Sequence, residues 1–120
     1  MIELFLLKNH ILNNKTISFG YMFGSYANDT YTNDSDIDIA LYLSDRSLDN
    51  KLQLNYELSK LLKKDVDLVV LNEIKNIYLL DNIIQKSILI KDSDKRIDFE
   101  LTKQHDIIDY KEFKRMIDAA

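Results

Sequence analysis

The sequence predicts one α/β domain of the α+β kind, in which a small mixed sheet carries helices packed against it. Apolar side chains alternate over residues 17–23 and 37–43 with the two-residue period of strands. Amphipathic stretches with the period of helices separate such strands, most clearly over residues 47–63. The 120 residues contain no proline, no repeat and no low-complexity linker, so we expect a single hydrophobic core.

The first half of the chain is predicted to begin with a helix over residues 2–13 and a strand over residues 16–23. A short helix is expected from Ser25, and a second strand over residues 37–43. The long helix over residues 47–63 needs a capping residue, for which the candidates are Ser44, Asp45 and Ser47. Its apolar face is predicted to comprise Leu48, Leu52, Leu58, Leu61 and Leu62.

The second half continues the same alternation. A third strand is expected over residues 66–71, and Asn72 is placed to cap a helix that runs to about residue 86. A fourth strand closes the domain over residues 87–91. The inward side chains of the helix are predicted to be Ile74, Ile77, Leu80 and Ile84.

A Gly24-Ser25 pair follows the first strand, at a point where the chain turns. Glycine lets a phosphate approach the backbone because it has no Cβ, and the Ser25 hydroxyl adds a donor to a phosphate oxygen. Free backbone N–H groups at the start of a helix would face the same anion.

Asp36 and Asp38 lie two residues apart at the start of the second strand. Side chains two apart on a strand share a face at about 6.6 Å, so both carboxylates can converge on one or two hard cations. Taken alone, a Gly-Ser pair marks a turn and an Asp-x-Asp step marks a solvated strand entry. The two together, each at the end of an apolar strand, predict a site for phosphate and metal.

A third carboxylate is predicted on the next strand. Asp67 lies within a segment that is otherwise apolar on both faces, where a carboxylate is costly unless it is paired, hydrogen-bonded or bound to metal. Asp65 points to the same face but sits at the strand entry, where water reaches it. We therefore choose Asp67, with Asp65 as the alternative.

These motifs resemble the signature of the nucleotidyltransferase superfamily that shares its catalytic fold with DNA polymerase β, and specifically of its minimal nucleotidyltransferases. The family pattern is Gly-Ser, ten residues, Asp-x-Asp and a carboxylate on the next strand, filled here by Gly24, Ser25, Asp36, Asp38 and Asp67. The resemblance covers most of the first ninety residues. It implies a polymerase β palm-like fold and a minimal nucleotidyltransferase domain over residues 1–91.

The resemblance also implies a mechanism. Asp36 and Asp38 would hold two Mg2+ ions about 3.5 to 4 Å apart. Asp67 would complete the site of the second ion and help to accept the proton of an attacking hydroxyl. Gly24 and Ser25 would hold the β and γ phosphates of ATP, which serves as the AMP donor.

One position departs from the family pattern. Minimal nucleotidyltransferases commonly read Gly-Ser-x-Ala-Arg-Gly, whereas here Asn28 stands at the arginine position. Arginine binds two phosphate oxygens and neutralises charge, and asparagine offers only a neutral amide, so weaker nucleotide binding or lost activity is the alternative to an active enzyme. Arg46, Lys63 and Lys64 are placed to substitute, although each taken singly is typical of a solvated charge at an element end.

The amino-acid composition argues against several kinds of site and partner. The absence of cysteine excludes disulfides and thiolate metal sites and fits a reducing cytoplasm. A net charge of −4 and a pI near 5.1 argue against a broad surface for nucleic acid. The apolar start contains Glu3 and no basic region, and no run approaches the ~20 apolar residues of a membrane span. His10 and His105 have no ligand-spaced partner, and Tyr26 is the tyrosine best placed to line a nucleotide pocket.

Residues 92–120 form a C-terminal extension, which either belongs to the same compact unit or binds a partner. Apolar side chains alternate with charges up to Leu101, and later recur every three or four residues at Ile107, Tyr110, Phe113 and Ile117. Such a stretch covers the sheet of its own domain or presents an apolar face to another protein. Arg96, Phe99-Glu100 and Asp109-Tyr110 resemble the extensions of minimal nucleotidyltransferases encoded with HEPN ribonuclease toxins.

The resemblance therefore implies an antitoxin that acts as a protein adenylyltransferase, transferring AMP from ATP to a tyrosine of a HEPN toxin. A domain of this size leaves no second domain for an antibiotic, a tRNA end or a DNA duplex, so we expect another protein to present the substrate. One alternative is an inactive antitoxin that blocks its toxin by binding alone, which Asn28 favours. The other is a small-molecule nucleotidyltransferase.

Overall fold

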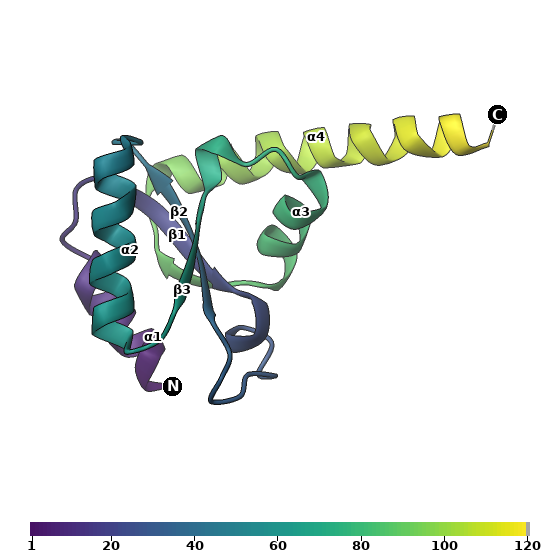
Figure 1. The fold of residues 1–120 in the computed structure, drawn as a ribbon. Helices are drawn as coiled ribbons and strands as arrows, with labels where there is room; N and C mark the ends of the chain where they lie inside the picture. Colours follow the sequence, from purple (N-terminus) through teal and green to yellow (C-terminus); the bar gives the residue numbers. More distant parts are fainter. Residues whose placement is uncertain (120) are drawn as a thin grey trace.

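The computed structural model describes residues 1–119, which form three layers with a four-stranded sheet between two pairs of helices (Figure 1). The elements in chain order are α1 (Ile2–Ile11), β1 (Ile17–Phe23), η1 (Gly24–Tyr26), β2 (Ile37–Leu43), α2 (Leu48–Leu62), β3 (Val66–Val70), η2 (Leu71–Glu73), α3 (Ile77–Lys86), β4 (Ile88–Lys91) and α4 (Asp94–Asp118). The α+β class predicted from the sequence is confirmed.

The strands follow the order β3-β2-β1-β4. β1 runs antiparallel to both β2 and β4, and β2 runs parallel to β3, so the sheet is mixed as predicted. Among the described residues β3 is paired on one side only, and its register sets Asp67 opposite Asp38. The two predicted carboxylates are therefore direct neighbours across two strands.

Each face of the sheet has its own buried cluster. α1 and α2 cover the first face and pack Leu7, Leu54 and Leu58 onto it. α3 and the first half of α4 cover the second face, where Leu80 and Ile107 are buried against the strands. The alternation in β2 explains the division, because Ile37, Ile39 and Leu41 belong to the first cluster and Ala40 to the second.

The prediction for α2 was right about its cap and partly wrong about its apolar face. The Ser47 hydroxyl accepts a hydrogen bond from the Asn50 N–H at 3.2 Å, which fixes the start of the helix. Leu58 and Leu62 are buried, whereas Leu48 and Leu52 are exposed. The buried stripe instead repeats every four residues from Leu54, and the two exposed leucines stand on another side of the helix.

The cap predicted for the next helix was wrong. Asn76 caps α3 and accepts from the N–H groups of Tyr78 and Leu79, so the helix begins later than expected. Asn72 lies in η2, where its side chain exchanges hydrogen bonds of 2.7 and 3.2 Å with the backbone of Leu43. It thereby ties the chain after β3 to the end of β2. Of the four predicted inward side chains, Leu80 is buried, and the half-buried Ile74, Ile77 and Ile84 pack against the same cluster.

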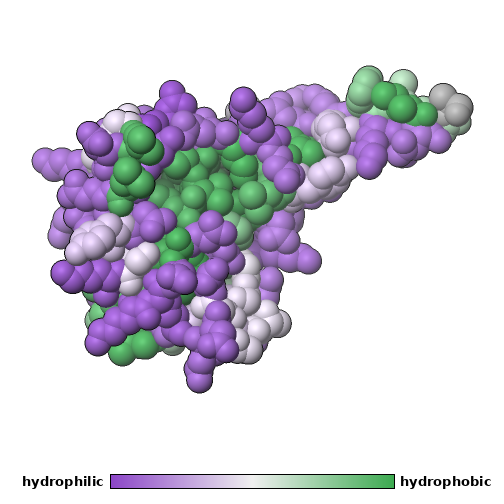
Figure 2. Space-filling model, in the orientation of Figure 1, coloured by the Kyte–Doolittle hydropathy of each residue, from purple (hydrophilic) through white to green (hydrophobic). Residues whose placement is uncertain are grey.

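The C-terminal extension is one helix from Asp94, so the apolar alternation up to Leu101 does not mark a strand. Its first half packs on the sheet, since the Phe99 ring lies 5.5 Å from the Phe19 ring and Ile107 is buried. Its second half projects beyond the rest of the molecule (Figure 1), and apolar atoms gather near its far end (Figure 2). No helix within residues 1–119 combines the length and apolarity that a membrane crossing requires.

Two of the three positions that resemble the toxin-linked family, Arg96 and Phe99-Glu100, anchor this first half. Arg96 bridges Asp92 and Glu100 along the helix. Glu100 also accepts a hydrogen bond from the buried Tyr21 hydroxyl, and its nearby charge together with burial raises the pKa of that tyrosine far above the usual range. These contacts fix the direction in which α4 leaves the sheet.

Candidate functional site

Three aspartates meet where β2 and β3 begin, on the face of the sheet that α3 and α4 partly cover. Asp38 is the second residue of β2 and is half-buried, and Asp67 stands beside it in register on β3. Asp36 precedes β2 and is exposed. Asp67 is exposed too, because β3 is an outer strand, so the cost of burial invoked from the sequence does not apply to it. Its place is defined by pairing with Asp38.

Electrostatics identify Asp38 as the centre of this group. The pKa of Asp38 is raised above its usual value, first by burial and then by the negative charges of Asp67 and Asp36. Asp65 is not among the causes, and its backbone oxygen instead accepts the Ile37 N–H at 3.0 Å. The geometry thus favours Asp67 over Asp65 as the third carboxylate.

The Gly24-Ser25 turn lies directly against Asp38. Gly24 has a φ of +72°, and a Cβ at this position would overlap a carboxylate oxygen of Asp38. The Ala27 and Asn28 N–H groups close the turn on the Gly24 carbonyl at 3.1 and 3.0 Å. Within residues 1–119 the Ser25 N–H has no hydrogen-bond partner and is available to an anion, whereas the Tyr26 N–H faces the Phe23 carbonyl that begins the 3-10 turn.

The helix expected from Ser25 is a single 3-10 turn, Gly24–Tyr26. A segment of this length has no appreciable dipole, because the dipole of a helix is the sum of many aligned peptide units. Anion binding here therefore depends on the Ser25 N–H and on the half-buried Ser25 hydroxyl.

Gly24→Ala is expected to lower the free energy of unfolding by about 1 to 2 kcal/mol from the positive φ alone. The overlap with Asp38 adds to this cost, so the same change should cost less in an Asp38→Ala background. Urea unfolding of the two single variants and the double variant measures both terms. An equal cost in both backgrounds would show that the side chain of Asp38 is not in the way.

All three aspartates offer carboxylate oxygens, which are the ligands that a hard divalent cation prefers. The negative charges of Asp67 and Asp36 raise the pKa of Asp38, so both repel its ionised form. As the side chains stand, residues 1–119 contain no group of three or more His, Cys, Asp or Glu arranged to hold a metal ion. Metal binding by Asp36, Asp38 and Asp67 therefore remains a prediction.

The cations considered as substitutes for a phosphate-binding arginine lie in different places. Arg46 follows β2 and thus sits at the end of that strand opposite to Asp38, roughly 20 Å away along the sheet. Lys63 and Lys64 precede β3 and lie at the carboxylate end, where Lys64 donates to the Asn33 carbonyl at 3.0 Å. Asn28 itself is exposed at the close of the turn.

The histidines and Tyr26 lie outside the site. His10 is 3.4 Å from Glu57, and His105 is 3.9 Å from Asp109 on the surface of α4. Tyr26 is buried in the cluster beneath α1 and α2, with its ring stacked on Tyr31 at 4.3 Å. It therefore supports the turn from behind rather than lining an open pocket.

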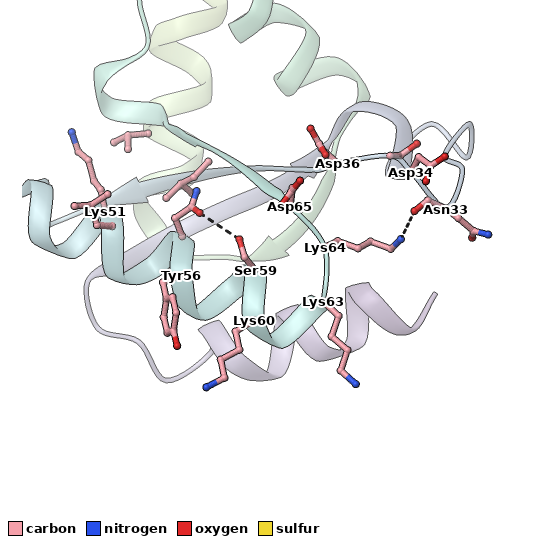
Figure 3. Close-up of a pocket in the computed structure, with 15 residues that line it drawn as sticks. Asn33, Asp34, Asp36, Lys51, Tyr56, Ser59, Lys60, Lys63, Lys64 and Asp65 are labelled. Atoms are coloured by element: carbon pink, nitrogen blue, oxygen red, sulfur yellow. Dashed lines mark hydrogen bonds between the residues drawn. The ribbon is translucent and has the colours of Figure 1, made fainter.

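A cavity of about 970 Å³ lies on the other side of β3, between that strand and α2 (Figure 3). It reaches the candidate site through Asp36 and Asp65 but is lined by none of Gly24, Ser25, Asp38 and Asp67. We place the chemistry at Asp36, Asp38 and Asp67 rather than in the cavity, because Asp38 lies against the Gly24 turn and in register with Asp67. No sequence pattern indicated this cavity, because it depends on β3 being the outer strand.

Comparison with known proteins adds a family. The model of a family described as polymerase beta, nucleotidyltransferase matches residues 7–96. None of the curated proteins compared with the chain matches it.

Several solved structures resemble nearly the whole chain. A toxin-antitoxin crystal structure with AMP-PNP contains a chain that is 26% identical, with a TM-score of 0.72 over 98% of this chain and 92% of that one. A tri-AMPylated HEPN toxin from Shewanella oneidensis in complex with an MNT antitoxin gives 23% identity and a TM-score of 0.71, over 95% and 94% of the two chains. The toxin-antitoxin MntA-HepT gives 22% and 0.70, over 93% of each. The likeness confirms the predicted nucleotidyltransferase fold.

Proposed function

The chain belongs to the polymerase β nucleotidyltransferase family, and we propose that it is an antitoxin that transfers AMP from ATP to a tyrosine of a HEPN ribonuclease toxin. The observation that carries the proposal is the contact between the Gly24 turn and Asp38, with Asp67 in register beside it. In this arrangement the Ser25 N–H and hydroxyl, which can donate to a phosphate, lie next to carboxylates that can act on the reacting hydroxyl. The resemblance to toxin-antitoxin structures, one with AMP-PNP and one with a tri-AMPylated toxin, supports the choice of partner and donor.

The chain's own groups have distinct roles in the proposed reaction. The Ser25 N–H and the Ser25 hydroxyl donate to the β and γ phosphates of ATP. Asp67, exposed beside Asp38, accepts the proton of the incoming tyrosine hydroxyl. The hydroxyl oxygen bonds to the α phosphorus, the bond from that phosphorus to the bridging oxygen breaks, and pyrophosphate leaves. Mg2+ bound by Asp36, Asp38 and Asp67 would neutralise the phosphate charge and lower the pKa of the hydroxyl.

The direct test uses a HEPN ribonuclease of the same organism, chosen by the proximity of its gene to the gene for this chain. The purified toxin is incubated with the chain, ATP and Mg2+, and its intact mass and its ribonuclease activity are then measured. We expect an AMP adduct on a tyrosine and a parallel loss of ribonuclease activity. A toxin that is silenced without any change in mass would favour inhibition by binding alone.

Inhibition by binding is the second candidate, and Asn28 favours it. Its exposed side chain stands at the close of the phosphate turn, where an arginine would add charge. Asn28→Arg should therefore tighten ATP binding by about 1.5 to 3 kcal/mol if a charge-assisted hydrogen bond forms. Titration calorimetry with ATP and Mg2+ measures the difference. Equal or weaker affinity would mean that the position points away from the phosphates.

A further inference from the structure

The cavity behind β3 is a groove between the outer edge of the sheet and α2 (Figure 3). Figure 2 shows apolar atoms on the surface in this central region, between α2 and α4. Leu68 and Val70 of β3 form one wall of the groove. The opposite wall, on α2, includes Leu52, which is 60% exposed, and Tyr56, which is 64% exposed. Large apolar side chains exposed along an open strand edge are unusual in a protein without a partner.

The backbone of this edge is available for pairing. Because the Asp65 carbonyl accepts from Ile37, odd-numbered residues of β3 face β2, and the N–H and C=O groups of Leu68 and Val70 point outward. The Asn55 side chain donates a hydrogen bond of 3.1 Å to the outward carbonyl of Val66. No hydrogen bond among the described residues reaches the outward N–H groups of Leu68 and Val70 or the Leu68 carbonyl, whereas the Val70 carbonyl begins the η2 turn. These groups are a template for an added strand.

The rim of the groove along and just after α2 is basic and carries Lys51, Lys60, Lys63 and Lys64, whereas Asp34, Asp36 and Asp65 stand at the end near the candidate site. Two of its lysines are engaged, Lys51 with Glu73 and Lys64 with a backbone carbonyl. Lys60 and Lys63 have no carboxylate partner among the described residues, and both side chains extend outward from the α2 side in Figure 3. An occupant with acidic side chains toward α2 would complement these charges.

We infer that the outer edge of β3 binds an extended, acidic segment of the toxin, which pairs with β3 as a fifth strand. The inference rests on the proposed function and names the surface that receives the substrate protein. The groove reaches Asp36, and Asp67 belongs to β3 itself, so a segment paired with β3 passes beside two of the carboxylates proposed to act on its hydroxyl. A second copy of this chain fits less well, because pairing two β3 edges would oppose two identical lysine rims.

Proline at position 70 tests the pairing directly. Val70→Pro removes one outward N–H, and the φ of −94° at this position lies near the range of proline, so the strand itself should tolerate the change. Val70→Ala is the matched control, because it truncates the side chain and keeps the N–H. We expect Val70→Pro to reduce toxin affinity and AMP transfer about tenfold relative to Val70→Ala, with unchanged ATP affinity.

A measurement on the unmodified chain covers the case in which the proline variant unfolds. Amide exchange followed by NMR should slow at Leu68 and Val70 when the toxin is added, whereas Val69, already paired with β2, should be protected in both states. Lys60→Glu with Lys63→Glu should weaken the complex, and Lys15→Glu with Lys86→Glu, on other surfaces, should not.

The outcomes separate the inference from the function beneath it. Unchanged exchange at Leu68 and Val70 in a toxin complex that still undergoes AMP transfer overturns strand addition and leaves the proposed function standing. Equal toxin affinity of Val70→Pro and Val70→Ala would likewise overturn strand addition and leave the proposed function standing. Failure of the unmodified chain to bind or modify the toxin overturns both.

Discussion

AMP transfer to the toxin should fall at least about a thousandfold when Asp36 and Asp38 are both changed to asparagine, which corresponds to about 4 kcal/mol of transition-state stabilisation. Both substitutions keep the size of the side chain and remove the negative charge that we propose for metal binding. Intact mass of the toxin after incubation with ATP and Mg2+ is the measurement. An undiminished AMP adduct from the double variant would refute the assignment of these carboxylates.

The same double variant should remain folded and melt at an equal or higher temperature. The raised pKa of Asp38 means that the folded protein binds its proton more tightly than the unfolded chain does. Stability from this group is therefore present at low pH and is lost as the pH rises through the raised value, so at neutral pH the ionised form costs stability. Asparagine removes that cost, as expected for a site in which function and stability conflict.

Asp65→Asn is the matched control for the carboxylates. Asp65 lies two residues before Asp67 on the same chain, but it does not contribute to the raised pKa of Asp38. We expect Asp65→Asn to retain AMP transfer and Asp67→Asn to lose it. The reverse result would restore the alternative that the sequence left open.

Much of this fold was predictable because local patterns determine it. Strict alternation identified β1 and β2, and three capping candidates that included Ser47 placed the start of α2. The proximity of Gly24, Asp38 and Asp67 agrees with the grouping expected from the two motifs and from the resemblance to the nucleotidyltransferase signature.

What escaped prediction depends on the order of the strands. The sequence does not reveal that β3 is the outer strand. The outer position of β3 explains why Asp67 is exposed and why Leu52 stands over an open groove. Asn72 was mistaken for a helix cap because a side chain that serves the backbone of Leu43 has the same local signature. Such long-range contacts carry no periodic signal.

The first half of α4 packs on its own domain, and the second half leaves the other interpretation of the C-terminal extension, partner binding, as a prediction. Near the sheet, Phe99 and Ile107 join the buried cluster. Beyond it, Tyr110 makes an edge-on contact with Tyr78 at 5.8 Å, and Phe113 and Ile117 remain 61% and 56% exposed. The helix thus begins in the core of its own domain and ends with apolar side chains that the domain does not bury.

The complex with the toxin should weaken strongly when Tyr110, Phe113 and Ile117 are all changed to serine, by about 2 kcal/mol or more if they occupy the centre of the interface. The melting temperature of the isolated chain should hardly change, because exposed apolar side chains stabilise only the state that buries them. Pull-down of the toxin beside thermal melts of the isolated chain provides both measurements.

Ile107→Ser on the same helix is the contrasting control. Ile107 is only 4% exposed, and removing its side chain should cost about 2 to 5 kcal/mol and lower the melting temperature by many degrees. If the triple serine variant lost as much stability as this control, its three side chains would be packing on their own domain. The second half of α4 would then no longer be a candidate surface for the toxin, and the groove beside β3 would be the remaining candidate.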